Sequence, residues 1–216
     1  MTHPWWPLFD LRIKNGPLAL RAMTEADLAG LADTLPNDLE QDPAATRYPG
    51  LPDRVNRGII VHQGYWAAWG RWSIDSWNLP FVTLLDGEII GTQTLEGDNF
   101  VQRRVVDTAS YLQPAVRGQG YGKAMRRAVL ALAFGEMGAE MAITAAWHDN
   151  QASLGVSRAL GYQPNGESRH VSQDRVDRMV HLRLMRADWL ASGQAAGIAI
   201  EGFDACRPLF GLEQSP

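Results

Sequence analysis

The sequence predicts a single domain of mixed α/β class, in which helices flank one central sheet. The chain has 216 residues, of which 45% are hydrophobic and 20% charged, enough for one sizeable core. Short β-branched runs meet at Asn15-Gly16 and Asp86-Gly87, which are dipeptides that favour tight hairpin turns. Apolar patterns with the helical period alternate with these runs, as is typical of a sheet covered by helices.

The N-terminal part is expected to form two strands, a helix, a loop and a second helix. In chain order these segments cover residues 8–13, 18–21, 24–35, 36–52 and 54–71. Thr24 and Asp27 resemble a capping box with Asp in place of Glu, which begins the first helix. Several prolines interrupt residues 36–52, so neither helix is expected to extend through this loop.

The rest of the chain is expected to alternate strands with helices. A hairpin, a polar turn, a strand, a helix, a buried strand, a short helix and a final hairpin follow one another. The hairpin is predicted at residues 79–85 with 88–95, the polar turn at 98–102 and the next strand at 105–112. The helix after the glycine loop has Met125, Val129 and Leu132 on one face, and the last elements are predicted at 141–147, 151–160, and 166–171 with 179–184. Residues 141–147 are almost all apolar, which indicates a strand buried on both faces.

A glycine-rich segment links the strand at 105–112 to the helix after it. Gly118, Gly120 and Gly122 alternate there, and a glycine turn that opens a helix leaves N–H groups pointing one way. Residues 113–135 carry four cations and no acid, in a chain whose formal net charge is −4. The segment is therefore predicted to be a phosphate-binding loop at the positive end of a helix. The alternative is a glycine turn without a ligand.

Spacing decides which phosphate loop this is. Gly118 to Gly122 is one residue too short for a P-loop, and Ala124 stands where its hydroxyl would be. The third glycine of a dinucleotide fingerprint would fall on Lys123. The pattern R-x-x-G-x-G fits, with Arg117, Gly120 and Gly122.

This pattern resembles the pyrophosphate motif of the GNAT superfamily of acyl-CoA N-acyltransferases. A second segment, from Asn150 to Tyr162, resembles that family's N-x-x-[AS]-x-x-x-x-x-x-x-G-[FY] pattern and lies one helix and one strand later. The resemblance covers about residues 18–184. It implies a single GNAT-type domain whose mixed sheet splays at the strand before the glycine loop, so that pantetheine lies in the resulting V.

Within the superfamily, the chain is most similar to the branch that acylates ribosomal-protein N-termini, the RimJ/RimL-like enzymes. Residues 6–11, 106–110 and 202–211 resemble an actinobacterial subgroup that includes a succinyl-CoA transferase. Residues 1–216 are expected to form one domain with its core at 18–184. The N-terminal strand and the extension at 185–216 would pack on that core or on a partner subunit, in a homodimer or larger homo-oligomer.

The resemblance implies direct attack of an amine on a thioester, with a backbone N–H near Leu112 polarising the carbonyl. The tyrosine that many members use as the acid is replaced by Ser157. Ser153 is therefore our candidate for stabilising the thiolate, and an ordinary helix serine is the alternative. Asn150 would bind the pantetheine arm or only cap a helix. The expected CoA-binding residues are Ser110, Tyr111, Leu112, Arg117, Gly118, Gln119, Gly120, Tyr121, Gly122, Lys123, Asn150, Ser153 and Arg158.

Residues 62–72 repeat aromatic side chains at helical spacing. They predict either a buried helix face or the wall of an acceptor pocket, so His62, Trp66 and Trp69 are candidate substrate contacts. Arg103 and Arg104 are candidates for binding the carboxylate of a succinyl donor, with surface solvation as the alternative.

No single general base is identified by the sequence. The glutamate of the ribosomal branch would fall at Ser172 and is absent. The remaining candidates are Asp107, Glu96, His170 and His148. A water relay would suffice for an α-amino group of low pKa.

The expected donor is acetyl-CoA, with succinyl-CoA as the rival. The expected acceptor is a primary amine on a small molecule, a protein N-terminus or a lysine. Nucleic acid, membrane and metal partners are not expected, and the single cysteine, Cys206, together with an N-terminus that shows no leader pattern, favours the cytoplasm. A non-catalytic acyl-CoA-binding module and a structural subunit remain as alternatives.

Overall fold

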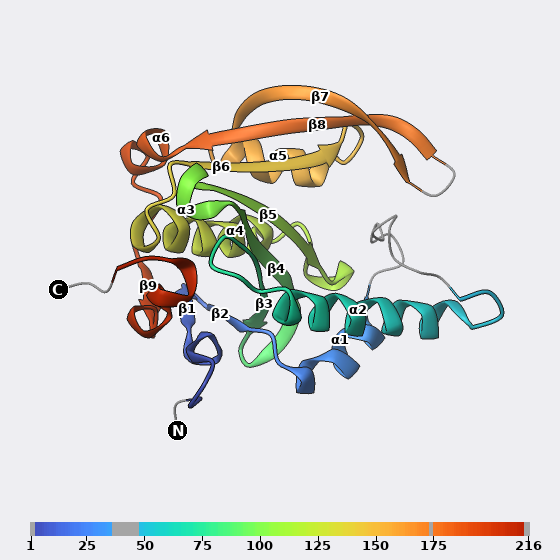
Figure 1. Cartoon of the computed structure of the whole chain (residues 1–216). Coiled ribbons are helices and arrows are strands. Elements are labelled where there is room, and N and C mark those ends of the chain that lie inside the picture. Colours follow the sequence, from blue (N-terminus) through green and yellow to red (C-terminus); the bar gives the residue numbers. More distant parts are fainter. Residues whose placement is uncertain (1–2, 36–47, 173–174, 214–216) are drawn as a thin grey trace.

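The computed structural model describes residues 3–35, 48–172 and 175–213. Its strands form one mixed sheet, and most of the core packs against that sheet. The strands occur in the order β7-β8-β6-β5-β4-β3-β2-β1-β9 (Figure 1). Their bounds are β1 Arg12–Asn15, β2 Leu18–Ala22, β3 Ser76–Leu85, β4 Glu88–Asp98, β5 Val105–Leu112, β6 Met141–Trp147, β7 Gln163–Ser172, β8 Arg175–Met185 and β9 Ile198–Glu201. The helices are α1 Leu28–Thr34, α2 Asp53–Gly70, α3 Phe100–Arg103, α4 Tyr121–Ala131, α5 Gln151–Ala159 and α6 Arg186–Ala191.

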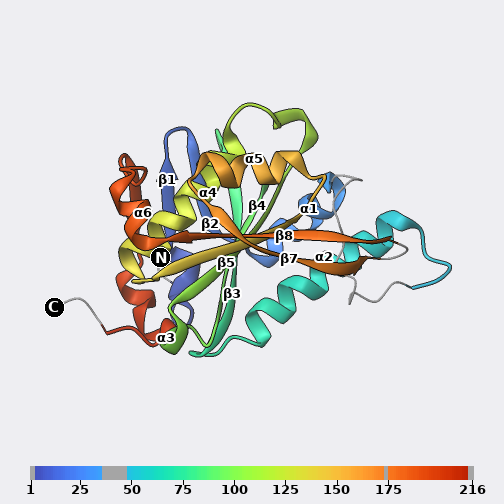
Figure 2. The same ribbon diagram turned by 90° about the horizontal axis from the view of Figure 1, so that it is seen from above.

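Helices cover both faces of this sheet. The helices α4 and α5 lie on one face and α2 lies on the other (Figure 2). Met125 and Val129 of α4 are fully buried in the main core, whereas Val61 and Tyr65 of α2 pack on a smaller cluster around Val82. The prediction of an α/β domain with a mixed, helix-flanked sheet is confirmed.

The strands β5 and β6 diverge to form a V. They pair in parallel only from Val105 with Met141 to Asp107 with Ile143. A side-chain hydrogen bond, in which Thr144 Oγ1 donates to the Thr108 carbonyl over 3.0 Å, is the last link before they separate. On its other side, β5 remains paired with β4 as far as Leu112. The sheet therefore opens beside the strand that leads into the glycine loop, as predicted.

Several local predictions are wrong. Residues 7–10 form a 3₁₀ helix, not a strand, because Pro7 at its first position removes a ladder donor. A short helix, α3, replaces the predicted polar turn at 98–102. The last hairpin is longer than predicted. The C-terminal extension, by contrast, follows one of its two expected packings, since β9 pairs with β1 of its own chain.

The end of the aromatic helix α2 and the turn after it contact segments near both termini. Trp69 and Trp72 stack with ring centroids 5.8 Å apart, and Trp6 packs edge-on against both. The Trp72 Nε1 donates a hydrogen bond of 3.1 Å to the Leu209 carbonyl. The prediction of a buried helix face therefore holds in part for Trp69, which is partly buried against the core, whereas Trp66 is 54% exposed.

Gly91 of β4 lies so close to the end of β5 that no side chain fits there. A Cβ there would lie 2.2 Å from the Tyr111 carbonyl oxygen of β5. We expect Gly91→Ala to destabilise the protein by about 1–3 kcal/mol, since the backbone must move. Thermal unfolding measures this, with Gly64→Ala as the matched control. A Cβ at Gly64, inside α2, meets nothing within 4 Å, so that variant should gain roughly 0.5–1 kcal/mol. Equal melting temperatures would contradict the prediction.

Candidate active site

The glycine loop has the backbone of an anion-binding turn. Gly118 and Gly120 adopt φ values of +76° and +86°, and Gly120 is the N-cap residue of α4. A Cβ at either position would meet nothing within 4 Å, so the space outside the loop is open. Side chains are disfavoured here by the backbone conformation. The exposed amides at the start of an eleven-residue helix therefore suit the phosphates of a CoA molecule.

The rest of the loop is tied to the end of β5. The Arg117 Nε donates a hydrogen bond of 3.0 Å to the Leu112 carbonyl. A Cβ at Gly122 would touch Leu112 and Val156 at 3.5–3.6 Å, so α4, α5 and β5 approach one another closely at that point. Lys123 is exposed on the first turn of α4. The expected CoA-binding residues Ser110 to Lys123 thus form one continuous strand, loop and helix end.

Helix α5 contributes the second group of expected CoA contacts. The Asn150 Oδ1 accepts a hydrogen bond of 3.0 Å from the Ser153 N–H, so Asn150 caps the helix. Ser157 Oγ donates to the Ser153 carbonyl over 3.0 Å. In the described part of the chain, the Ser153 hydroxyl makes no hydrogen bond. Arg158 is exposed in the last turn of α5. The roles of Asn150, Ser153 and Arg158 toward CoA stay predictions.

Two carboxylates meet on the opposite face of the sheet. Glu96 of β4 lies directly across from Asp107 of β5, and strand alternation turns both side chains toward the face that carries α2. Among the described residues, neither carboxylate makes an ion pair. Burial raises the pKa of Glu96, and the charge of Asp107 raises it further. Burial also raises the pKa of Asp107, although the Thr108 N–H, Arg126 and His181 oppose that rise.

The sequence named Glu96 and Asp107 separately but did not predict their pairing. The other two candidate bases lie on or near the β7–β8 hairpin. His148 is 3.4 Å from the Asp177 carboxylate, and the His170 ring lies 6.4 Å from that of His181. His181, which sequence reasoning missed, is 2.5 Å from Ser168 Oγ through its Nε2 and interacts electrostatically with Asp107.

Arg126 was counted from the sequence only as one of the four cations of residues 113–135, and its contacts were not predicted. It lies on α4 between the buried residues Met125 and Ala128 and is only 3% exposed. Its guanidinium donates to Ser157 Oγ over 3.1 Å and to Ser110 Oγ over 3.2 Å. The sequence feature that could have indicated a buried arginine is its position within the apolar face of the predicted helix.

The predicted substrate contacts are dispersed. His62 bonds through Nδ1 to the Gly58 carbonyl at 2.8 Å, and its ring packs against Trp66. Arg103 and Arg104 precede β5, so they lie at the closed end of the V. Arg103 pairs with the Asp98 carboxylate at 2.6 Å, and the Arg104 guanidinium covers the Phe100 ring at 5.4 Å.

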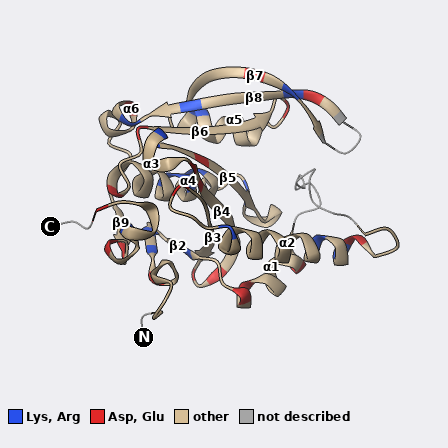
Figure 3. Cartoon of the chain, viewed as in Figure 1, with Lys and Arg blue, Asp and Glu red and all other residues tan. Residues whose placement is uncertain are grey.

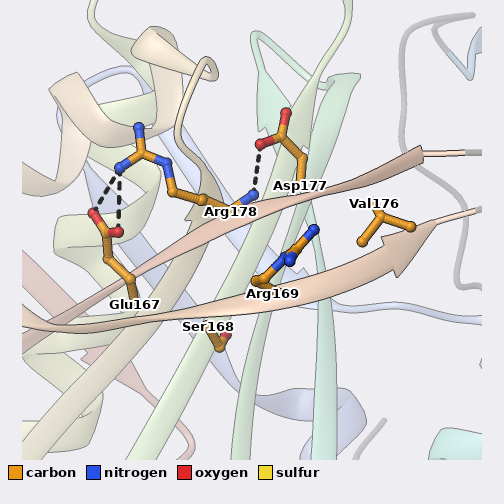
Figure 4. A pocket seen from close by; sticks show the side chains of 6 residues that line it. All are labelled: Glu167, Ser168, Arg169, Val176, Asp177 and Arg178. Atoms are coloured by element: carbon orange, nitrogen blue, oxygen red, sulfur yellow. Dashed lines mark hydrogen bonds and ion pairs between the residues drawn. The ribbon is translucent and has the colours of Figure 1, made fainter.

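A separate pocket of about 580 Å³ lies along the β7–β8 hairpin (Figure 4). It includes an ion pair of 3.2 Å between Arg178 Nη1 and Glu167 Oε2. In the sheet order, β8 and β6 separate β7 from β5, so this pocket is not part of the V. Basic and acidic residues are interspersed over the described elements (Figure 3). Within these residues, no helix has the length and apolar character to cross a bilayer, and no group of three metal-binding side chains occurs.

An open V beside a glycine-rich helix start is the arrangement expected of an acyl-CoA-dependent N-acyltransferase. Residues 18–163 match the acetyltransferase (GNAT) domain model. The chain therefore belongs to the GNAT acetyltransferase family, whose members use acetyl-CoA.

Solved structures share the fold at low sequence identity. Mycobacterium smegmatis RimJ in complex with CoA-disulfide is 16% identical, with a TM-score of 0.69, over 87% of this chain and 97% of that one. A mutant of the spermidine N-acetyltransferase SpeG from Vibrio cholerae is 14% identical, with a TM-score of 0.64, over 82% of this chain and 98% of the other.

Proposed function

We propose that this enzyme transfers an acetyl group from acetyl-CoA to a primary amine by direct attack. The observation that carries the proposal is the Glu96–Asp107 pair beside the V. Two half-buried carboxylates without an ion pair among the described residues repel each other, and an ammonium group bound between them would relieve that repulsion. The pair would hold the acceptor and then remove the proton from its nitrogen.

The residues divide into two sets according to the face of the sheet. On the α4 side, the loop from Arg117 to Lys123 would bind the CoA phosphates, and a backbone N–H near Leu112 would polarise the thioester carbonyl. On the α2 side, the Thr108 N–H, Arg126 and His181 oppose the rise in the pKa of Asp107, so Asp107 would hold the ammonium. Glu96, whose pKa burial and Asp107 raise, would act as the base.

Release of free CoA thiol by the purified protein in the presence of amines tests this function. A panel of a polyamine, a lysine derivative and a peptide with a free N-terminus covers the acceptor classes. Amine-dependent thiol release with N-acetylated product supports the proposal. If CoA bound tightly without turnover on any amine, the chain would be a non-catalytic acyl-CoA-binding module.

Succinyl-CoA is the second candidate donor, and only the subgroup resemblance favours it. A competition of CoA thioesters for the protein, followed by native mass spectrometry, compares the two donors directly. If the protein preferentially binds and turns over succinyl-CoA, succinyl-CoA becomes the proposed donor in place of acetyl-CoA. Assembly as a homodimer or larger oligomer also remains a proposal, which light scattering tests.

Ser153→Ala tests the proposed role of this hydroxyl at the departing sulfur. We expect kcat to fall by about 10²-fold, with little change in the Kd for CoA, because the interaction would form only as the thiolate leaves. Ser73→Ala, on the exposed turn before β3, is the control for a lost hydroxyl. A wild-type kcat in Ser153→Ala would show that this side chain has no part in the departure of sulfur.

A further inference from the structure

Arg126 is a buried cation that connects the two sides of the V. It follows Gly122 by one helical turn and reaches hydroxyls on three elements. Its Nη2 donates to Ser110 Oγ of β5, and its Nη1 donates to Ser157 Oγ of α5. A longer contact of 3.5 Å reaches Thr144 Oγ1 of β6. The guanidinium therefore lies at the level where β5 and β6 separate.

The surroundings of Arg126 lack an anion in contact with it. Among the described residues, all its hydrogen-bond partners are neutral hydroxyls, and its buried Nε has no partner. Burial lowers its pKa, whereas Tyr162 and Asp107 act to raise it. Asp107 faces the other side of the sheet by strand alternation. A buried charge and an unpaired donor are costly, and both are explained if an anion binds there during the reaction.

The geometry of the V limits which anion can arrive. The phosphates of CoA suit the glycine loop, one helical turn before Arg126. The pantetheine arm of CoA would run from this loop along β5. It could extend no further than the hydrogen bond between Thr144 and the Thr108 carbonyl, which closes the V. The far end of the arm, which carries sulfur, would therefore lie near Ser110, whose Oγ already contacts Arg126.

We propose that Arg126 is a catalytic residue that stabilises the negative charge on the CoA sulfur as the thioester breaks. This inference rests on the proposed function. The amine nitrogen forms a bond to the carbonyl carbon, the carbon–sulfur bond breaks, and sulfur leaves with the electron pair. The proton from nitrogen passes to the Glu96–Asp107 pair. Arg126 donates a hydrogen bond to the thiolate and keeps its own proton, so the missing tyrosine at Ser157 is not required.

The thiol pKa of CoA bound to the wild-type protein tests this without any catalysis. Thiolate absorbance near 240 nm, followed against pH, should give a thiol pKa lower by about 1–3 than that of free CoA. The titratable groups whose charges act on Arg126 are Tyr162, which is buried beside it, and Asp107, which acts from the other face of the sheet. Burial raises the pKa of Tyr162 to about 12, and the titration therefore stays below pH 10. An unshifted thiol would overturn the proposal, even if the protein acetylates amines.

Two variants separate this role from a structural one. Arg126→Met replaces the charge with an apolar chain of similar length and should fold, since such replacements are often neutral or stabilising. It should return the bound thiol to its ordinary pKa and lower kcat by about 10–10²-fold at little cost in KM for acetyl-CoA. Arg126→Lys should restore part of both effects. If Arg126→Met fails to fold, Arg126→Lys and the wild-type titration still decide the matter.

The carboxylate of a dicarboxylic acyl group is the other anion that could reach this guanidinium. Equal losses of kcat for acetyl-CoA and succinyl-CoA in Arg126→Met would support the thiolate role. A loss confined to succinyl-CoA, with an unchanged thiol pKa, would overturn it and make Arg126 a donor-selecting residue. If no amine is acetylated while the bound thiol pKa is lowered, the proposed function fails and the anion site stands.

Discussion

Gly120→Asp is expected to weaken the binding of CoA by about 10³-fold. Gly120 is the N-cap residue of α4, and a Cβ there points into open space outside the loop. A carboxylate at this position would face the CoA phosphates. Two like charges about 4 Å apart near a protein surface repel by about 4 kcal/mol, which corresponds to the expected loss. Isothermal titration calorimetry with CoA measures it.

Gly120→Asn is the matched control for this variant. Asparagine and aspartate have nearly the same shape, and both tolerate positive φ better than most residues, so the backbone strain at φ +86° is similar in the two variants. Only the charge differs. We therefore expect Gly120→Asn to retain most of the affinity. Equal affinity in the two variants would show that the loop does not bind phosphate.

Glu96→Gln is expected to lower kcat by about 10²–10⁴-fold, the range for losing a general base. Glutamine keeps the shape and accepts the hydrogen bond of 3.2 Å from Thr94 Oγ1, but it cannot take a proton. The acid limb of the pH–rate profile should also change, since the raised pKa of Glu96 would no longer contribute to it. Steady-state kinetics with the best acceptor amine measures both effects.

The same substitution should stabilise the folded protein at neutral pH. The pKa of Glu96 is higher in the folded state than in the unfolded chain, so the stability linked to its protonation is present at low pH. That stability is lost as the pH rises through the folded pKa, and glutamine mimics the protonated form. We expect the Tm to rise by about 2–4 °C at pH 7.5, as for roughly 1 kcal/mol in a chain of this size. The gain should shrink as the pH falls toward about 4.3, the ordinary pKa of a glutamate.

Glu88→Gln is the control, because it makes the same chemical change at an exposed position of β4. It should alter neither kcat nor Tm appreciably. An inactive Glu96→Gln variant with a raised Tm cannot be explained by misfolding. Full activity in Glu96→Gln would remove the base from the proposed mechanism and favour a water relay.

The backbone of the proposed donor side could be predicted because it is encoded locally. The positive φ of Gly118 and Gly120 requires glycine, and Asn150 is a favoured residue at a helix start. Such preferences act within a few residues of the chain, so the glycines and the cap residues predicted the loop and the second helix, and their order resembles that of the GNAT motifs. The helix α4 and the strand β6 were predicted for the same reason, because their apolar periods are local.

Tertiary structure decided the two features that carry our proposals for the acceptor and for the sulfur, the Glu96–Asp107 pair and the buried guanidinium of Arg126. Glu96 faces Asp107 only because the register of β4 and β5 places them opposite each other, and no local spacing encodes that register. The contacts of Arg126 with Ser110 and Ser157 arise from the packing of α4 between a strand and a helix that come from different parts of the chain. By itself, the sequence determined the glycine turn and the capped helix that we propose bind the donor, whereas strand register and helix packing decided which side chains meet beside them.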